Sequence, residues 1–404
     1  MKSLTISRGA AVLLGMALSV STTVQAEEPA CSIGAQRSFT VPVSRPSPKV
    51  PAKGPTSPLQ NPYNMRISIQ GGGLHTVQVD TGSTGIVVSR ASVPNDLWRD
   101  TQSNGVMSYS SDGLNLVGRY AHRAVTLGGA PDAPQGKTGP FPTTVPIDIL
   151  ITACACALNP QDGSTPAAPE AGLDDFNSCE NLEGKSTVTH GKTVVFSSCK
   201  DSRGTSMMGV GFNRGSGPST NNPFLQLEDV NAGTVHAGYV IGETTIQLGL
   251  NQTNTKGFRF APLAPNPAFP AAKVPVREWL EPEASVRFDK TGDTLRASVL
   301  MDTGIDYMML TIPEKERVAQ FVSQKSCQSC VPQGTAMTLT LPATGEPALT
   351  YAFTLGKDVQ APRSVSWRGA EGSAHHINTG RYVMVTSDYA YDARCGQLGF
   401  SARK

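Results

Sequence analysis

The sequence has little charge and few long apolar runs, which narrows the kinds of protein it can specify. Charged residues make up only 16% of its 404 residues and the net charge is +2. No basic cluster stands out, so we expect no nucleic-acid partner. Beyond residue 26, no segment approaches the ~20 consecutive apolar residues of a membrane-spanning helix, so we expect no membrane span.

Signatures of several enzyme classes are also missing. No Gly-x-Ser-x-Gly elbow is present and the six histidines are scattered, which argues against the alternative of a serine hydrolase. The adjacent His375 and His376 raise the alternative of a metal site, but no companion ligands stand at helical or strand spacing. We therefore predict solvent-exposed loop histidines there, with no metal and no other cofactor.

Glycine and proline, by contrast, are abundant. The chain has 40 glycines and 30 prolines, which favours a turn-rich β protein over a helical one. Its first residues are typical of a secretory signal: Lys2 and Arg8 give positive charge, residues 10–20 are apolar, and residues 24–26 form a small-residue cleavage site. We expect an exported protein, periplasmic or secreted, with a lipid-anchored Cys31 as an alternative.

All eight cysteines follow the predicted signal, and an even number in an exported chain favours disulfides. Cys179 and Cys199 flank a strand-like segment, so a local bridge between them is one candidate pairing. Cys327 and Cys330 form a Cys-x-x-Cys pair, for which zinc binding and redox activity are the alternatives. The sequence leaves the connectivity open.

Two stretches far apart in the chain carry the same Asp-Thr-Gly tripeptide behind an apolar run. Asp80 follows Val-Gln-Val, and Asp302 follows Val-Leu-Met. Each is preceded by a hairpin pattern, residues 65–69 and 75–79 around three glycines, and residues 284–289 and 295–300 around a turn at 290–293. One such tripeptide is unremarkable at average residue frequencies. Two in the same context predict a structural repeat.

The chemistry of such a pair follows from charge repulsion. Two carboxylates that face each other cannot both ionise cheaply, so they share one proton. One of them is then a base that activates water, and the other is an acid that polarises a carbonyl.

On these motifs the sequence resembles the pepsin-like aspartic proteases, whose two lobes each contribute one Asp-Thr-Gly. The resemblance covers most of residues 63–404 apart from residues 130–200, and we expect a divergent, bilobal, bacterial member. It implies an all-β, bilobal pepsin-like acid protease fold with a central cleft and few short helices. Carried over by position, Asp80 and Asp302 form the catalytic dyad. The resemblance assigns support of the dyad to Thr81, Gly82, Ser83, Thr303 and Gly304.

Weaker matches extend the resemblance. The hairpin at residues 106–118 looks like the flap that closes over substrate, with Tyr109 as its tyrosine and Tyr120 as the alternative. An ordinary surface hairpin is the other interpretation. Residues 207–209 (Met-Met-Gly) and 377–380 (Ile-Asn-Thr-Gly) look like the two strands that support the catalytic loops. A proline followed by acidic residues predicts an amphipathic helix over residues 313–322.

Two positions depart from the family pattern. Ile305 stands where the second lobe usually has a serine or threonine, and Asn378 with Thr379 replaces an apolar pair. A lost hydroxyl donor removes a hydrogen bond of ~1 kcal/mol, or ~2 kcal/mol to a charged carboxylate. The neighbouring acid Asp306 is expected to raise the pKa values of the dyad.

The predicted organisation has four parts. Residues 1–26 are the signal peptide, 27–62 an extended N-terminal leader, 63–235 the N-terminal β lobe with a Cys- and Pro-rich insertion at 130–200, and 236–404 the C-terminal β lobe. The predicted function is an exported, monomeric aspartic endopeptidase that cleaves peptide or protein substrates at acidic pH. The alternatives are a non-catalytic pepsin-like binding protein and a generic secreted β protein.

Overall fold

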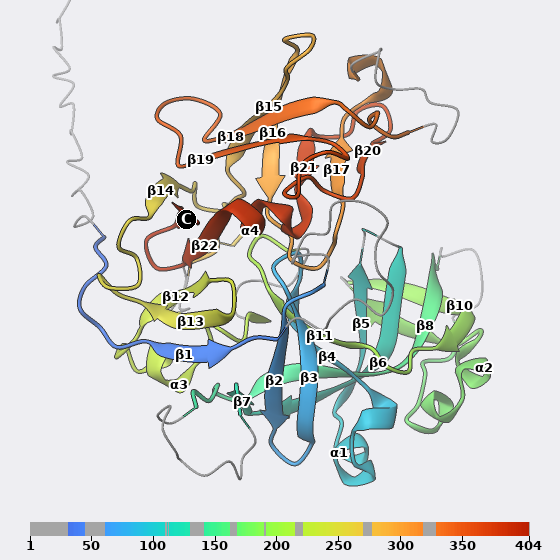
Figure 1. Cartoon of the computed structure of the whole chain (residues 1–404). Coiled ribbons are helices and arrows are strands. Elements are labelled where there is room, and N and C mark those ends of the chain that lie inside the picture. Colours follow the sequence, from blue (N-terminus) through green and yellow to red (C-terminus); the bar gives the residue numbers. More distant parts are fainter. Residues whose placement is uncertain are drawn as a thin grey trace, which may run out of the picture. The chain divides into compact units, whose positions relative to one another are not determined.

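The computed structural model describes residues 31–44, 61–109, 111, 113–129, 141–161, 168–189, 191–214, 221–269, 277–317 and 329–403. This part of the chain consists mainly of β-strands, with few short helices (Figure 1). The predicted signal peptide, Asp112 of the flap turn, residues 318–322 of the predicted helix and Cys327 lie outside these ranges. Within them, no helix has the length and apolar character needed to cross a membrane.

The first Asp-Thr-Gly turn belongs to a ten-stranded sheet. Its strands are β2 (Asn64–Ile69), β3 (Gly73–Asp80), β4 (Thr84–Ser89), β5 (Ser103–Tyr109), β6 (Leu114–Arg123), β7 (Val125–Leu127), β8 (Ile147–Pro160), β9 (Ser186–Thr189), β10 (Lys192–Asp201) and β11 (Ser206–Val210). The predicted hairpin is formed by β2 and β3, with Gly71 and Gly73 at positive φ in its turn. Alternate residues Val77 and Val79 of β3 are fully buried, so the strand is anchored up to Asp80.

The second Asp-Thr-Gly turn belongs to a seven-stranded sheet. Its strands are β15 (Glu283–Phe288), β16 (Thr294–Leu300), β17 (Met308–Thr311), β18 (Ala336–Leu341), β19 (Leu349–Thr354), β20 (Val365–Arg368) and β21 (His376–Asn378). The predicted second hairpin is present, with Val286 of β15 opposite Leu295 of β16.

Five strands in each of these sheets follow the same plan. The order β2-β3-β11-β4-β8 in one sheet corresponds to β15-β16-β21-β17-β20 in the other (Figure 1). The β3–β11 and β16–β21 pairs are parallel, β11–β4 and β21–β17 are antiparallel, and β4–β8 and β17–β20 are parallel. The predicted all-β fold class is thus confirmed, and the predicted repeat extends well beyond the tripeptides.

A third sheet joins segments from both ends of the described chain. Its six strands are β1 (Phe39–Pro42), β12 (His236–Ile241), β13 (Thr245–Leu250), β14 (Arg259–Pro262), β22 (Ser387–Asp392) and β23 (Gln397–Ala402). Strand β1 lies within the predicted leader, yet it pairs along its whole length with β13 and buries Val41 completely. This part of the leader is therefore integrated into the fold.

The helices are short. They are α1 (Asn95–Arg99), α2 (Cys179–Leu182), α3 (Glu228–Asn231) and α4 (Val383–Thr386), with 3-10 turns at Arg90–Ser92, Asp174–Asn177, Glu314–Glu316 and Gly380–Tyr382. The helix predicted from Pro313 does not begin there, because Arg317 already has an extended backbone after a single 3-10 turn. The Arg317 guanidinium donates to the carbonyl oxygens of Ile312 and Gly369, so tertiary contacts override the local helical pattern.

The disulfides differ from the pairing that sequence proximity suggested. Cys179 bonds to Cys154, and Cys199 bonds to Cys156, so the candidate bridge between Cys179 and Cys199 is wrong. Cys154 and Cys156 are two residues apart on β8, a spacing that places both on one face of the strand. The two bridges therefore tie the later part of the insertion, at Cys179 and Cys199, to its own strand β8. Cys330 and Cys395 are also disulfide-bonded.

Candidate active site

The two Asp-Thr-Gly turns meet face to face. Asp80 is the last residue of β3, and Asp302 comes two residues after the end of β16. On the β3 side, Gly209 of β11 pairs with Asp80, and a Cβ atom at Gly209 would lie only 2.4 Å from the backbone nitrogen of Thr84. The glycine expected in this supporting strand therefore allows the close packing that holds the first turn.

Thr81 and Thr303 lock the two turns together. The backbone N–H of Thr81 donates to the hydroxyl of Thr303 at 3.0 Å, and the N–H of Thr303 donates to the hydroxyl of Thr81 at 2.9 Å. The hydroxyls in turn donate across the contact, from Thr303 to the carbonyl of Val79 and from Thr81 to that of Met301. All of these groups are buried, where an unpaired donor would be costly. Every one of these donors has a partner on the opposite side of the contact.

Glycine is required next to each aspartate because the opposite carboxyl group lies so close. A Cβ atom at Gly82 would lie 2.5 Å from the carboxyl carbon of Asp302, and one at Gly304 would lie 2.5 Å from Oδ1 of Asp80. The same glycines hold the acids in place through their backbones. Gly82 N–H donates to Asp80 Oδ1 and Gly304 N–H donates to Asp302 Oδ1, both at 2.7 Å.

The two carboxyl groups lie close together in a buried setting, with Asp80 exposed by 3% and Asp302 by 5%. Burial, followed by repulsion from the charge of Asp302, raises the pKa of Asp80 to about 8; the Ser83 hydroxyl and the Gly82 N–H act in the opposite direction. A pair of this kind holds one proton between its two carboxyl groups over a wide pH range, because the second ionisation would place two charges side by side.

Each aspartate has one further donor at its Oδ2 atom, and the two donors differ. The Ser83 hydroxyl donates to Asp80 at 2.5 Å. Ile305 offers no such group to Asp302; instead, Asn378 donates from Nδ2 to Asp302 Oδ2 at 2.7 Å. Sequence reasoning missed this role, since it treated Asn378 only as a defect in an apolar strand. A polar residue at a position where the family pattern has an apolar one, in a chain lacking the usual hydroxyl, was the available signal.

Two buried arginines lie near the dyad. Arg381 donates from Nε to the carbonyl of Ile305 at 3.0 Å and from Nη2 to that of Gly304 at 2.9 Å, which fixes the second turn from behind. Arg214 is ion-paired with Glu281. Burial lowers the pKa of both guanidinium groups, whereas nearby acids, among them Asp302, raise it.

Asp306 plays a smaller part than the sequence suggested. It forms an ion pair with Arg363 at 3.4 Å, and the raised pKa of Asp80 is caused by burial and by Asp302. A third acid is therefore not needed to explain the proton affinity of the pair.

The hairpin of β5 and β6 reaches the half of the chain that carries Asp302. Tyr109 ends β5 opposite Leu114, is buried in a small apolar cluster, and donates from its hydroxyl to the sulfur of Met107. At the tip, the carbonyl of Ser111 accepts hydrogen bonds from the Tyr307 hydroxyl at 3.3 Å and from Arg368 Nη1 at 3.0 Å. The tip is thus tied to residues that follow the second turn. Tyr120, the alternative, packs against the same cluster from β6.

The adjacent histidines each contact a carboxylate. His375 Nε2 lies 2.8 Å from Glu316, and His376 Nε2 lies 3.2 Å from Glu281. Both were predicted as exposed loop residues, but His376 lies on β21, where burial and the charge of Arg214 lower its pKa to about 4. It was misplaced because its strand pairs with segments distant in sequence.

One other group of side chains has the spacing of metal ligands. His236, Asp392 and Cys395 place their ligand atoms within 4.8 Å of one another. Cys395 is disulfide-bonded and offers no thiolate, while His236 and Asp392 pair directly at 2.8 Å in full burial. With the sulfur in a disulfide, only two of the three groups keep the chemistry of metal ligands.

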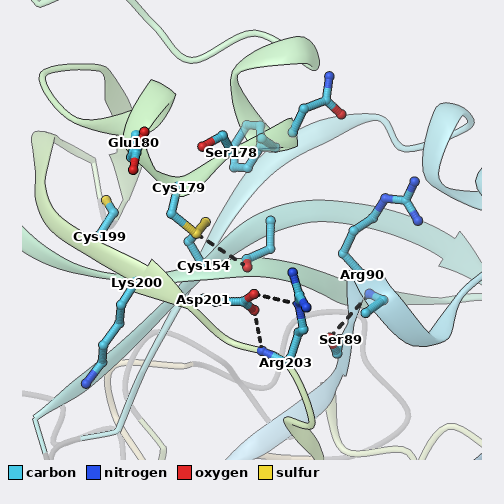
Figure 2. A pocket seen from close by; sticks show the side chains of 14 residues that line it. Ser89, Arg90, Cys154, Ser178, Cys179, Glu180, Cys199, Lys200, Asp201 and Arg203 are labelled. Atoms are coloured by element: carbon cyan, nitrogen blue, oxygen red, sulfur yellow. Dashed lines mark hydrogen bonds and ion pairs between the residues drawn. A yellow bond between two sulfur atoms is a disulfide. The ribbon is translucent and has the colours of Figure 1, made fainter.

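A cavity of about 560 Å³ lies in a different part of the same half as Asp80. It is formed around the Cys154–Cys179 bridge of the insertion, and Figure 2 shows Arg203 paired with Asp201 among the side chains that line it. Neither Asp80 nor Asp302 lines this cavity. The buried acids, and not the volume of this cavity, therefore mark the candidate active site.

Comparison with known proteins adds one structural likeness. No family model and no curated protein matches the chain. Among solved structures, the chain is similar to the crystal structure of an aspartic proteinase from Irpex lacteus, with 13% sequence identity and a TM-score of 0.49. The match covers 91% of this chain and 98% of the other.

Proposed function

We propose that this chain is an aspartic endopeptidase that hydrolyses peptide bonds with water activated by Asp80 and Asp302. One observation carries the proposal: two buried carboxyl groups, supplied by two repeats of the same strand plan, lie close together. Ordinary packing does not favour such a pair, because burying two acids against each other is costly. Their arrangement suits acid–base catalysis, in which one group is protonated and the other is not.

The reaction follows from this division of roles. A water between the carboxyl groups gives a proton to the ionised aspartate while its oxygen attacks the carbonyl carbon of the peptide. The protonated aspartate gives its proton to the carbonyl oxygen, so a neutral tetrahedral intermediate forms. The aspartate that took the proton from water then gives it to the peptide nitrogen, and a hydroxyl of the intermediate returns a proton to the other aspartate as the C–N bond breaks. A carboxylic acid and an amine are released, and the pair again holds one proton.

We propose an extended peptide, cleaved between apolar residues, as the substrate. The β5–β6 hairpin would cover it as a flap, and Tyr109 would stand just before the tip of that flap. The bonds from Tyr307 and Arg368 to Ser111 support this role, since they give the hairpin tip a docking point beside the second turn. Disulfides in the insertion support export to an oxidising compartment.

The pH range depends on how long the pair keeps its single proton. A mildly acidic optimum was expected from the sequence. The raised pKa of Asp80 extends the singly protonated state upward through neutral pH, so activity is expected to persist at pH 7 and to fall above about pH 8.

Purified protein incubated with denatured casein from pH 3 to 9 tests the proposal. We expect cleavage that a statine-type peptide blocks and that Asp80→Asn and Asp302→Asn each lower by at least about a thousandfold. Cleavage that survives both substitutions would rule out the two-aspartate mechanism.

A second candidate is a non-catalytic protein that binds extended peptides, because the hydroxyl usually found in the second turn is missing at Ile305. Wild-type protein that binds the statine-type peptide but cleaves nothing at any pH would favour this candidate.

A further inference from the structure

Asn378 occupies a special place in the repeat. Equivalent positions in the two halves are 222 residues apart, as Thr81 and Thr303 show. Asn378 pairs with Leu300 of β16 and Met309 of β17, and Met207 pairs with Gln78 of β3 and Val87 of β4. Asn378 is therefore the counterpart of Met207, and the apolar residue of one half is replaced by a carboxamide in the other.

Both ends of the Asn378 side chain are engaged. Nδ2 donates to Asp302 Oδ2 at 2.7 Å, and Oδ1 accepts from the N–H of Gly380 at 3.0 Å. A backbone N–H can only donate, so Gly380 fixes which end of the amide carries the oxygen. The side chain is only 4% exposed, so water does not compete for these contacts.

The donors around the two aspartates differ in one chemical respect. Asp302 Oδ1 faces the N–H of Gly304 and its Oδ2 faces the Asn378 amide, and both of these groups only donate. Asp80 Oδ1 faces the N–H of Gly82, but its Oδ2 faces the Ser83 hydroxyl, which either donates or accepts. A proton is therefore accommodated on Asp80 more easily than on Asp302.

We infer that Asn378 is a positioning residue of the dyad: it replaces the hydroxyl missing at Ile305 and keeps Asp302 as the ionised, water-activating carboxylate, with the shared proton on Asp80. This inference rests on the proposed function. It gives the two aspartates distinct roles, which the symmetric repeat of the backbone does not.

The charges around the pair agree with this assignment. Arg214 and Arg381 act electrostatically on both carboxyl groups, and they remain cationic throughout the working pH range. His376 on β21 has a pKa lowered to about 4 and is neutral above it. Among the other acids nearby, Glu281 pairs with Arg214 and lies 3.2 Å from His376, Asp306 pairs with Arg363, and Glu278 acts electrostatically on Arg214. The environment thus favours one ionised carboxylate in the pair.

The test replaces Asn378 with leucine, which has a similar volume but no donor. The acidic limb of the kcat–pH profile reports protonation of the water-activating carboxylate, and it should move up by about one to two pH units, the size expected for a lost hydrogen bond to a charged group. At pH values below the acidic limb of the variant, kcat of Asn378→Leu should be at least about tenfold lower than that of wild type, while KM changes less than about threefold. An acidic limb that stays in place would overturn the inference.

Two further variants separate positioning from simple packing. Met207→Leu alters the counterpart position, which is not a donor to Asp302, and should leave the acidic limb unmoved. Ile305→Thr combined with Asn378→Leu returns a hydroxyl to the turn and should bring the limb most of the way back. If Asn378→Leu fails to fold, Asn378→Ser replaces it with the same expected upward shift.

A measurement without catalysis keeps this inference distinct from the proposed function. In protein labelled with 13C at aspartate carboxyl carbons, the Asp302 signal should titrate at a higher pH in Asn378→Leu than in wild type. An inactive wild-type protein that still shows this difference would refute the endopeptidase and retain the role of Asn378. Identical titrations would refute that role whether or not the protein is active.

Discussion

Thr81 and Thr303 exchange hydrogen bonds between the two halves, each backbone N–H donating to the hydroxyl of the other residue. Each hydroxyl also donates to the carbonyl of the residue just before the opposite aspartate. Neither threonine therefore has all its hydrogen-bond partners unless both turns are in place. The spacing of the two carboxyl groups is therefore set by a buried network between the halves.

Removing one hydroxyl of this network should loosen the pair. We expect Thr81→Val, which keeps the shape, to lower the free energy of unfolding by about 1–3 kcal/mol, because buried donors and acceptors lose their partner. Urea denaturation measures the effect. Thr126→Val breaks a hydroxyl contact with Thr143 in the same sheet, away from the dyad, and should leave kcat nearly unchanged, unlike Thr81→Val. Equal effects of both variants on kcat would contradict the special role of Thr81.

The glycine beside Asp80 should not tolerate a side chain. In Gly82→Ala the new methyl group would overlap the Asp302 carboxyl group, so we expect casein cleavage to fall by at least about a hundredfold as the carboxyl groups separate. Gly172→Ala is a matched control, because its Cβ atom would have only an ordinary contact at 3.6 Å. Full activity of Gly82→Ala would show that the turns do not approach as closely as described.

The raised pKa of Asp80 should be visible in stability. Between its ordinary value of 3.8 and about 8, folded Asp80 binds a proton that the unfolded chain has lost, so stability falls as pH rises through this range. Asp80→Asn lacks this dependence. From pH 5 to pH 8, wild type should lose more than ~1 kcal/mol of unfolding free energy relative to the variant, since one pKa unit corresponds to ~1.4 kcal/mol.

Urea unfolding of both proteins at the two pH values checks this prediction. Asp148→Asn, which removes a largely exposed carboxylate, is the control. Between pH 5 and pH 8, the unfolding free energy of wild type relative to this variant should change much less than it does relative to Asp80→Asn. If the gap between wild type and Asp80→Asn is the same at both pH values, the pKa of Asp80 is not raised.

The tie between the hairpin tip and the second half should affect substrate binding. Tyr307→Phe and Arg368→Met each remove one donor to the Ser111 carbonyl, and a net hydrogen-bond contribution of about 0.5–1.5 kcal/mol at such solvent-accessible contacts corresponds to a factor of about 2–10. We expect KM for a peptide substrate to rise by this factor, and amide hydrogen exchange in β5 and β6 to quicken. Arg363→Met, which breaks only the pair with Asp306, serves as control. Unchanged exchange in the hairpin would argue against a tie that matters in solution.

Much of the architecture around the two turns was predictable because it is encoded locally. Both hairpins were found from alternating apolar residues on either side of a glycine-containing turn, and they lead into Asp80 and Asp302 as expected. The glycine of residues 207–209 was found for the same reason, since close packing leaves a recognisable small residue.

Other features depend on partners far away in the chain. The pairing of Cys179 with Cys154 required knowing that β8 brings Cys154 beside Cys179, and the extended backbone at Arg317 required knowing where its guanidinium finds its acceptors. Strand β1 was not predicted within its proline-rich segment, because it is stabilised by pairing with β13, about 200 residues later in the chain.

By itself, the sequence determined that two acids would each end an apolar strand on a tight turn, because strand periodicity and turn chemistry act over a few neighbouring residues. Only the tertiary structure decided how those acids differ. The amide of Asn378 reaches Asp302 across 76 positions of chain, while Ile305, next to the turn, contributes no donor. Hydrogen-bond partners of this kind are chosen by packing, which no local pattern records.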